Sequence, residues 1–189
     1  MKKYLMLSLL IIFVFAFNLK SQDNLSVTIS SKNYSAGTIE VPVKLEFIDP
    51  TLQVGAFDLR IEIDDPSVLN VLSANPGPGL PAGMISPVAG SNPFVVSWAS
   101  TSGLVSTSLT DDLLLTLVMD ASAGTSSLTF VFGGPIETQF YENDAQSSPI
   151  QTKFNNGMIA ITSAVPLPVW VLFLSAGLFA VYITFKRKR

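Results

Sequence analysis

The sequence predicts an all-β domain of the sandwich type. Two segments, Thr38–Phe47 and Phe57–Asp64, alternate apolar and polar residues with a period of two, which is typical of strands with one buried face. Elsewhere, short apolar segments are separated by clusters of Gly, Pro, Asn and Ser. This pattern of short strands and turn residues favours a sandwich over a helical or α/β domain.

The expected strands follow one another in chain order. Pro42 lies on the polar side of its strand and cannot donate a ladder hydrogen bond, so it predicts an edge strand or a bulge. Leu113–Val118 is apolar on both faces and predicts a central strand, covered on its second side by a loop or by another protein. A helical turn is expected only at Pro66–Leu72. Besides the two alternating segments, the expected strands are Leu25–Ser30, Phe94–Ala99, Leu113–Met119, Ser127–Phe132, Thr138–Tyr141 and Gly157–Thr162.

Between Asn75 and Pro93 the chain holds too many prolines and glycines for regular structure. A loop of this length in a compact domain is often functional, and its apolar residues suggest that it folds back over the sandwich. Covering the sandwich is the favoured role, and ligand binding is the alternative. Trp98 shares a strand face with Phe94 and Val96, which favours a core position over an exposed platform for sugars.

The N-terminus has the features of a secretory signal peptide. Lys2 and Lys3 precede an uncharged apolar segment, Leu5–Phe17, which is too short to span a membrane. Cleavage is expected near Ser21–Gln22, and an uncleaved N-terminal anchor is the alternative. The chain has no cysteine, which excludes lipoprotein processing and disulfides, so the exported domain must be held together by its core.

The C-terminus predicts a transmembrane helix. The run from Val165 to Phe185 (165–185) holds 21 residues without a charge, about the number that crosses a bilayer of roughly 30 Å. Lys186–Arg189 should stay in the cytoplasm under the positive-inside rule, so everything before the run faces outward. The predicted organisation is therefore a signal peptide (1–21), a β-sandwich domain (22–162) and a transmembrane segment with a basic tail (163–189).

The predicted exported domain is strongly acidic. Between the two terminal segments there are four basic residues and all 14 acidic residues of the chain, a net charge of −10. Such a surface repels phosphate backbones, so nucleic acid is not an expected partner.

Catalysis has little support. The chain has no histidine and no cysteine, which excludes Ser-His-Asp and Cys-His arrangements and the usual zinc sites. A glycosidase needs only two carboxylates, and Asp58, Glu62 and Asp64 share one strand face with next-but-one neighbours about 6.6 Å apart. A solvated strand produces this spacing routinely, so we expect no catalytic residues and no enzyme.

Oxygen ligands for calcium occur in three expected turns, at Asp64–Asp65, Asp111–Asp112 and Glu142–Asp144. None has EF-hand spacing, and acidic residues are also common in solvated turns. We assign no metal site and no cofactor, with calcium left open.

Several segments in succession resemble the cohesin domain, the module of scaffoldins that captures dockerin-bearing enzymes. They are VPVKLEF after Ala36–Gly37, GAFDLRIEIDDPSVLNVLSANPG, VSWASTSG, LLLTLVMDASAGTSSLTF and NNGMIAI, and they cover about residues 24–162. The resemblance implies a nine-stranded β-sandwich of jelly-roll topology, related in fold to cellulose-binding modules. It also implies that one flat face binds a dockerin, with Asp58 as a contact; alternation adds Arg60 and Glu62 to that face.

The tail is similar to the VPLPA variety of PEP-CTERM sorting signals, in which an exosortase-type membrane protease recognises the motif. The matching residues are Val165, Pro166, Leu167 and Pro168, and Val169 stands where that family usually has alanine. An ordinary single-pass anchor is the alternative.

The sequence thus predicts an exported, non-catalytic binding module, anchored by its C-terminal helix or released or attached at the cell surface after processing. The leading partner is a dockerin-type or other protein. One alternative is binding of a polysaccharide, for instance matrix exopolysaccharide, in the context of polysaccharide degradation. The other is a purely structural role at the cell surface.

Overall fold

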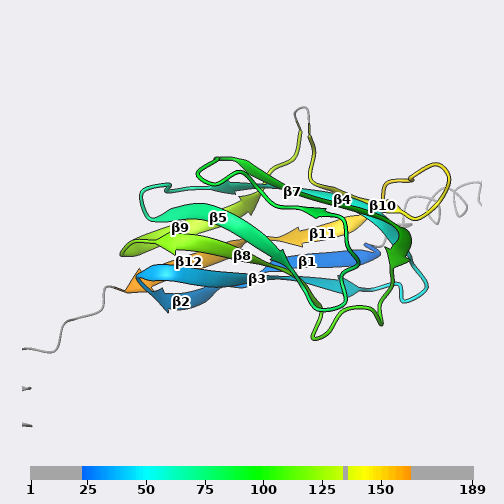
Figure 1. The fold of residues 1–189 in the computed structure, drawn as a ribbon, viewed down its shortest axis with the longest axis horizontal. Helices are drawn as coiled ribbons and strands as arrows, with labels where there is room; N and C mark the ends of the chain where they lie inside the picture. The colour runs from blue at the N-terminus through cyan, green and yellow to red at the C-terminus, as the bar shows by residue number, and fades with distance from the viewer. Residues whose placement is uncertain (1–22, 134–135, 163–189) are drawn as a thin grey trace, which may run out of the picture.

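The computed structural model describes residues 23–133 and 136–162, which form two β-sheets packed face to face (Figure 1). One sheet has five strands in the order β11-β1-β3-β8-β5, and the other has seven, ordered β2-β12-β9-β4-β7-β6 with β10 also paired to β4. The strands are β1 Leu25–Ile29, β2 Lys32–Ser35, β3 Gly37–Phe47, β4 Val54–Ile63, β5 Leu69–Pro76, β6 Met84–Ile85, β7 Phe94–Leu104, β8 Leu113–Ala121, β9 Gly124–Phe130, β10 Gln139–Glu142, β11 Thr152–Asn155 and β12 Gly157–Thr162. The predicted all-β sandwich is confirmed.

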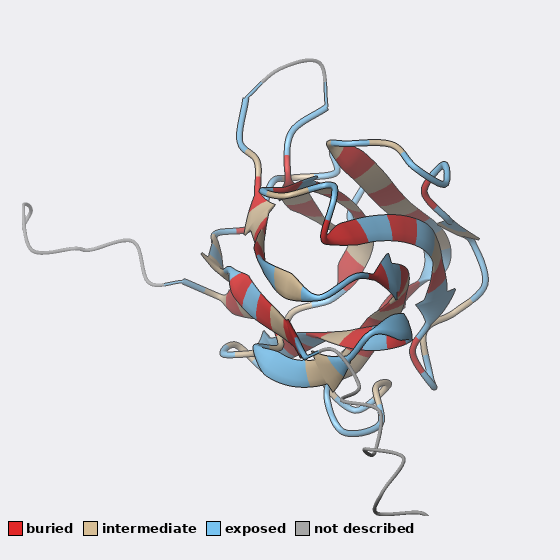
Figure 2. Ribbon diagram, turned by 90° about the vertical axis from the view of Figure 1, so that its left-hand side faces the viewer, coloured by how far each residue is buried: buried red, intermediate tan, exposed pale blue. Residues whose placement is uncertain are grey.

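The core lies between the two sheets. Buried and exposed residues alternate along the strands in Figure 2, as they do along β3 and β4. Phe57 of β4 stacks on Trp98 of β7 with ring centroids 5.6 Å apart, and it packs against Phe140 of β10 at 5.2 Å. Trp98 is 2% exposed, so the prediction that it belongs to the core is confirmed.

Three strands are interrupted rather than continuous. β1 and β11 pair in the five-stranded sheet, and their continuations β2 and β12 pair in the seven-stranded sheet. β9 and β10 lie one after the other along the same edge of β4. Counting each interrupted strand once reduces the twelve described segments to the nine strands that the resemblance implies.

The expectation that Pro42 marks an edge strand is wrong, because β3 lies between β1 and β8. Pro42 is tolerated there because the pairing of β1 ends one residue away, at Ile29–Val43. Ser30 still donates its N–H to the Pro42 carbonyl, at 3.0 Å, so Pro42 lies where β1 leaves the sheet and no ladder donor is needed. The expected bulge is present beside it, between Val43 and Lys44.

The helical turn expected at Pro66–Leu72 forms only over its first residues. Residues 66–68 make a turn, and β5 begins at Leu69. The turn is closed by the N–H groups of Val68 and Leu69, which both donate to the Asp65 carbonyl. β5 therefore replaces the end of the expected turn and occupies the edge of the five-stranded sheet.

Leu113–Val118 lies in β8, between β3 and β5, as a central strand should. The segment after β5 folds back as expected and is held by side chains at several points. The Trp98 indole N–H donates to the Pro81 carbonyl at 2.8 Å, and the Asn92 amide pairs with both the N–H and the carbonyl of Ile63 at 2.8 and 2.9 Å. Ser86 accepts the Ala74 N–H at 2.7 Å, which joins this segment to the edge of β5.

The predicted signal peptide and the predicted transmembrane tail lie outside the described residues. Within residues 23–133 and 136–162, no helix is long and apolar enough to cross a membrane.

Candidate functional site

The outward face of the seven-stranded sheet contains the three residues that the sequence assigns to partner binding. Asp58 and Arg60 are half-buried and Glu62 is exposed, and all three alternate with buried residues of β4. The structure therefore places them on one surface, as the alternation predicts. Their role in binding stays a prediction.

Strand register sets the neighbours of Asp58. Gln139 of β10 is opposite Asp58 on one side, Ser97 of β7 is opposite on the other, and Ile85 of β6 follows Ser97. Directly paired residues share a face of a sheet, so these four side chains form one row across four strands. The Ser97 hydroxyl donates a hydrogen bond of 2.5 Å to the Asp58 carboxylate, which fixes the carboxylate in the middle of the row.

The Arg60 side chain is held against the loop that contains Gly133. Its guanidinium donates to the Gly133 carbonyl at 2.9 Å, and its backbone N–H donates to the Thr138 hydroxyl at 3.1 Å. A guanidinium has five N–H donors, so this contact orients Arg60 while leaving other donors for a partner.

Toward β9 and β12 the face becomes less charged. Glu62 is opposite Thr129 of β9, and Ser127 of the same strand is opposite Met158 of β12. Met158 is 61% exposed and Ile85, at the far side of the sheet, is 67% exposed. The face therefore combines a central charged strip with an exposed apolar side chain near each flank.

Asp58 and Glu62 do not have the separation of a glycosidase pair. Asp58 and Glu62 are four residues apart on an extended strand, about 13 Å, which exceeds the separation of a glycosidase pair. Asp64 lies beyond the end of β4, where its N–H donates to the Ser127 carbonyl.

The acidic turns are shaped by their own hydrogen bonds. Asp65 accepts the Ser67 hydroxyl at 2.6 Å and the Ser67 N–H at 2.9 Å, which lowers the pKa of Asp65. Asp144 accepts N–H groups of Ser148 and Gln146, and the Ser148 bond is the main cause of its lowered pKa. In the described ranges, no group of three or more acidic side chains is placed to hold a metal ion.

Ser97, Gln139 and Ile85 belong to this face but were not assigned to it from the sequence. Their place depends on which strands pair with β4 and in what register, and neither is encoded in local periodicity. The apolar Ile85 was visible in the long loop, but the short strand β6 that brings it to the face was not.

Comparison with solved structures identifies the fold. The chain superposes on the seventh ScaB type I cohesin of Pseudobacteroides cellulosolvens with a TM-score of 0.59 and 16% identity, covering 78% of this chain and 97% of that one. It superposes on a non-cellulosomal cohesin of Archaeoglobus fulgidus with a TM-score of 0.57 and 21% identity, covering 75% and 94%.

A third neighbour is the sixth cohesin of scaffoldin B from Acetivibrio cellulolyticus, solved in complex with a Cel5 dockerin mutant. Its TM-score is 0.57 and its identity 17%, with 74% of this chain and 99% of that chain covered. No protein-family model and no curated protein sequence matches the chain. The described domain therefore has a cohesin-like β-sandwich fold.

Proposed function

We propose that this chain is a non-catalytic docking module that binds a dockerin-type protein through the outward face of the seven-stranded sheet. The observation that carries the proposal is the row from Gln139 to Ile85, with Asp58 oriented by Ser97 at its centre, on a cohesin-like fold. Two of the structural neighbours were solved with a dockerin bound, which supports a partner of this type.

An oriented carboxylate on a flat face suits recognition of another protein. Its position is fixed before binding, so little conformational entropy is lost when a donor from the partner reaches it. Charge-assisted hydrogen bonds to such a group are stronger than neutral ones. Burial of Trp98 removes that side chain as an aromatic platform for sugars.

We further propose that the domain is exported and that Val165, Pro166, Leu167 and Pro168 serve as a sorting motif for an exosortase-type protease, before a membrane-spanning tail. Thr162 ends β12 beside β2, where Ala36 donates its N–H to the Thr162 carbonyl at 3.1 Å. Ser163 and Ala164 are then the only residues between this point and the motif. An anchored domain would therefore lie close to the bilayer.

The proposal is tested by affinity capture with the full chain, immobilised in a mild detergent, from an extract of the source organism. Bound proteins are identified by mass spectrometry with and without EDTA, because the resemblance implies a dockerin that folds around calcium. We expect proteins that contain a dockerin to be recovered only without EDTA.

A pair of charge reversals locates the face. Asp58→Lys with Glu62→Lys should abolish capture, because both carboxylates lie on the outward face of β4. The matched control is Glu40→Lys with Glu46→Lys, which makes the same charge change on exposed positions of β3 in the other sheet. Capture that survives the first pair, or is lost equally with the second, contradicts the assigned face. Recovery of no dockerin-containing protein contradicts the proposed partner.

A further inference from the structure

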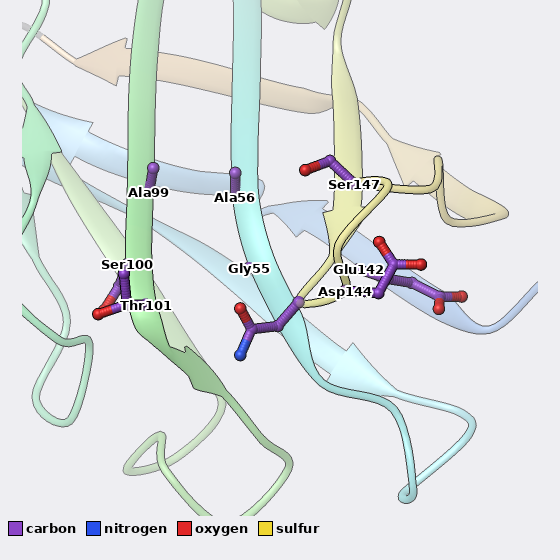
Figure 3. Close-up of a pocket in the computed structure, with 9 residues that line it drawn as sticks. Gly55, Ala56, Ala99, Ser100, Thr101, Glu142, Asp144 and Ser147 are labelled. Carbon is purple, nitrogen blue, oxygen red and sulfur yellow. The ribbon is translucent and has the colours of Figure 1, made fainter.

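A pocket of about 340 Å³ lies at one end of the candidate docking face (Figure 3). Its floor is made by Gly55, Ala56 and Ala99. Ala56 and Ala99 are paired across β4 and β7, two residues along each strand from the pair Asp58 and Ser97. The pocket is therefore continuous with the row that contains Asp58.

The pocket is built by two irregularities that coincide at Gly55. On the β7 side, the pairing passes from Ala56–Ala99 to Val54–Leu104, so residues 100–103 lie opposite Gly55 alone. On the β10 side, the register shifts between Tyr141 and Glu142. Bulges of this kind often lie next to functional sites, where they open a sheet and redirect side chains.

Glycine is required at position 55 for this shape. A Cβ there would lie 2.8 Å from the Cα of Asn143 and 3.0 Å from the Glu142 carbonyl oxygen. Asn143 also donates its N–H to the Gln53 carbonyl at 2.9 Å, which holds the loop after β10 against β4. The wall made by the loop after β10 is thus held in place by backbone contacts.

The lining is polar and acidic. It contains Ser100, Thr101, Asn143 and Ser147, with the carboxylates of Glu142 and Asp144 and no basic residue. Figure 3 shows the Ser147 side chain turned toward Ala56, whereas the two carboxylates lie on the outer side of the loop. A ligand would meet the small apolar groups of Ala56 and Ala99 and the hydroxyl of Ser147, while the two carboxylates contribute negative charge from the outer side of the loop.

We propose that this pocket receives an arginine or lysine side chain of the docked protein. The methylene groups would lie on Ala56 and Ala99, and the charged head would remain hydrated at the pocket mouth, attracted by Glu142 and Asp144 on the other side of the loop. Long basic side chains bind in this way, with an apolar stem on apolar surface and a hydrated head. Complementary charge also favours a basic group, because a concave acidic site concentrates cations. That the side chain belongs to a docked protein rests on the proposed function. That the pocket binds a basic group does not.

The test uses the full chain in detergent micelles, labelled with ¹⁵N, and two small probes. N-acetyl-arginine amide should shift the amide signals of Gly55, Ser100 and Asn143 with a dissociation constant in the millimolar range, as expected for a ligand of this size. N-acetyl-citrulline amide has nearly the same shape without the charge, and it should bind about tenfold more weakly. Equal binding of the two probes, or shifts that lie elsewhere, would overturn the inference.

Matched variants separate the pocket from general electrostatics. Glu142→Gln with Asp144→Asn should weaken arginine binding about tenfold, because the negative charge of the loop is lost. Glu46→Gln with Asp120→Asn removes the same charge from exposed positions on the other sheet and should leave binding unchanged. Ala99→Met, which fills the floor from an exposed position, should block the probe without changing the loop after β10. Binding that survives Ala99→Met would contradict the assigned floor.

The probe experiment and the capture experiment fail independently. Arginine binding without capture of a dockerin-containing protein leaves the pocket chemistry intact and contradicts the proposed partner. In the other case, charge reversal at Asp58 and Glu62 abolishes capture, but the parent protein does not bind the arginine probe. This result supports the docking face and contradicts the proposed ligand of the pocket.

Discussion

Asp58 and Ser97 face one another across β4 and β7, and the Ser97 hydroxyl donates directly to the Asp58 carboxylate. Both side chains are half-buried on the outward face. The bond leaves most of the acceptor capacity of the carboxylate free, because an ionised carboxylate accepts about four hydrogen bonds. Ser97 thus acts as a positioning residue for Asp58.

Replacing Ser97 by Ala should weaken binding of a captured dockerin-type protein about tenfold, since one oriented hydrogen bond to a charged group is lost. Binding is measured by calorimetry with the captured protein. If Ser97 acts only through Asp58, the double variant with Asp58→Asn should bind no more weakly than Asp58→Asn alone. Additive losses would show that Ser97 contacts the partner itself.

Trp98→Phe should lower the free energy of unfolding by about 2 kcal/mol, because the half-buried Pro81 carbonyl loses its donor and a small cavity forms beside Phe57. The measurement is urea unfolding of the full chain in detergent, followed by far-UV circular dichroism. An unchanged unfolding midpoint would mean that the segment after β5 is not held through Pro81.

Thr138, just before β10, links β4 to the residue after β9 through one buried hydroxyl. Its Oγ lies 3.0 Å from the Arg60 carbonyl and 2.8 Å from the Val131 carbonyl, and it accepts the Arg60 N–H. Thr138→Val keeps the shape but removes these partners, which should cost about 1–3 kcal/mol. Thr138→Ser retains the hydroxyl and is the control, expected to lie close to the parent. Equal destabilisation by both variants would show that only the methyl group matters.

Much of the fold could be predicted because its strands have one buried face. In β3 and β4, the period of two follows directly from a core on one side and water on the other. β2, β6 and β11 were not predicted, because they are four, two and four residues long and lie in edge positions that leave little periodic signal. β5 was hidden by the turn at residues 66–68, which resembles the start of a helix.

The candidate site was predictable only where one strand determines it. Alternation along β4 places Asp58, Arg60 and Glu62 together. The partners Ser97 and Ile85 depend on long-range register, and the pocket depends on two irregularities opposite Gly55. Bulges carry no local sequence pattern that distinguishes them from ordinary turns, so the pocket required the structure.

Acid should destabilise the domain partly through its turns. The pKa values of Asp65 and Asp49 are lowered by hydrogen bonds from Ser67 and Thr51 respectively. A carboxyl group with a folded pKa below its unfolded value of about 3.9 stabilises the fold above that pH, and the stabilisation is lost as pH falls through the folded pKa. The urea concentration at the midpoint of unfolding should therefore fall between pH 5 and pH 3 in the parent. The fall should be smaller in Asp65→Asn. An identical difference would show that the Asp65 turn is not linked to folding.

Tyr34 presents the opposite case, a buried hydroxyl without a hydrogen-bond partner among the described residues. Its hydroxyl is buried without a hydrogen bond in the described structure, and burial raises the pKa of the phenol. Because the charged form is disfavoured in the folded state, stability should fall as pH rises above about 10, the unfolded pKa. Tyr34→Phe removes the unpaired hydroxyl and keeps the ring beneath the Lys32 ammonium, which lies 5.5 Å from its centroid. Unfolding in urea should therefore require an equal or higher urea concentration, with a gain of up to about 1 kcal/mol, and the loss of stability above pH 10 should diminish. A clear destabilisation at neutral pH would instead indicate that the hydroxyl has a partner, such as an ordered water molecule.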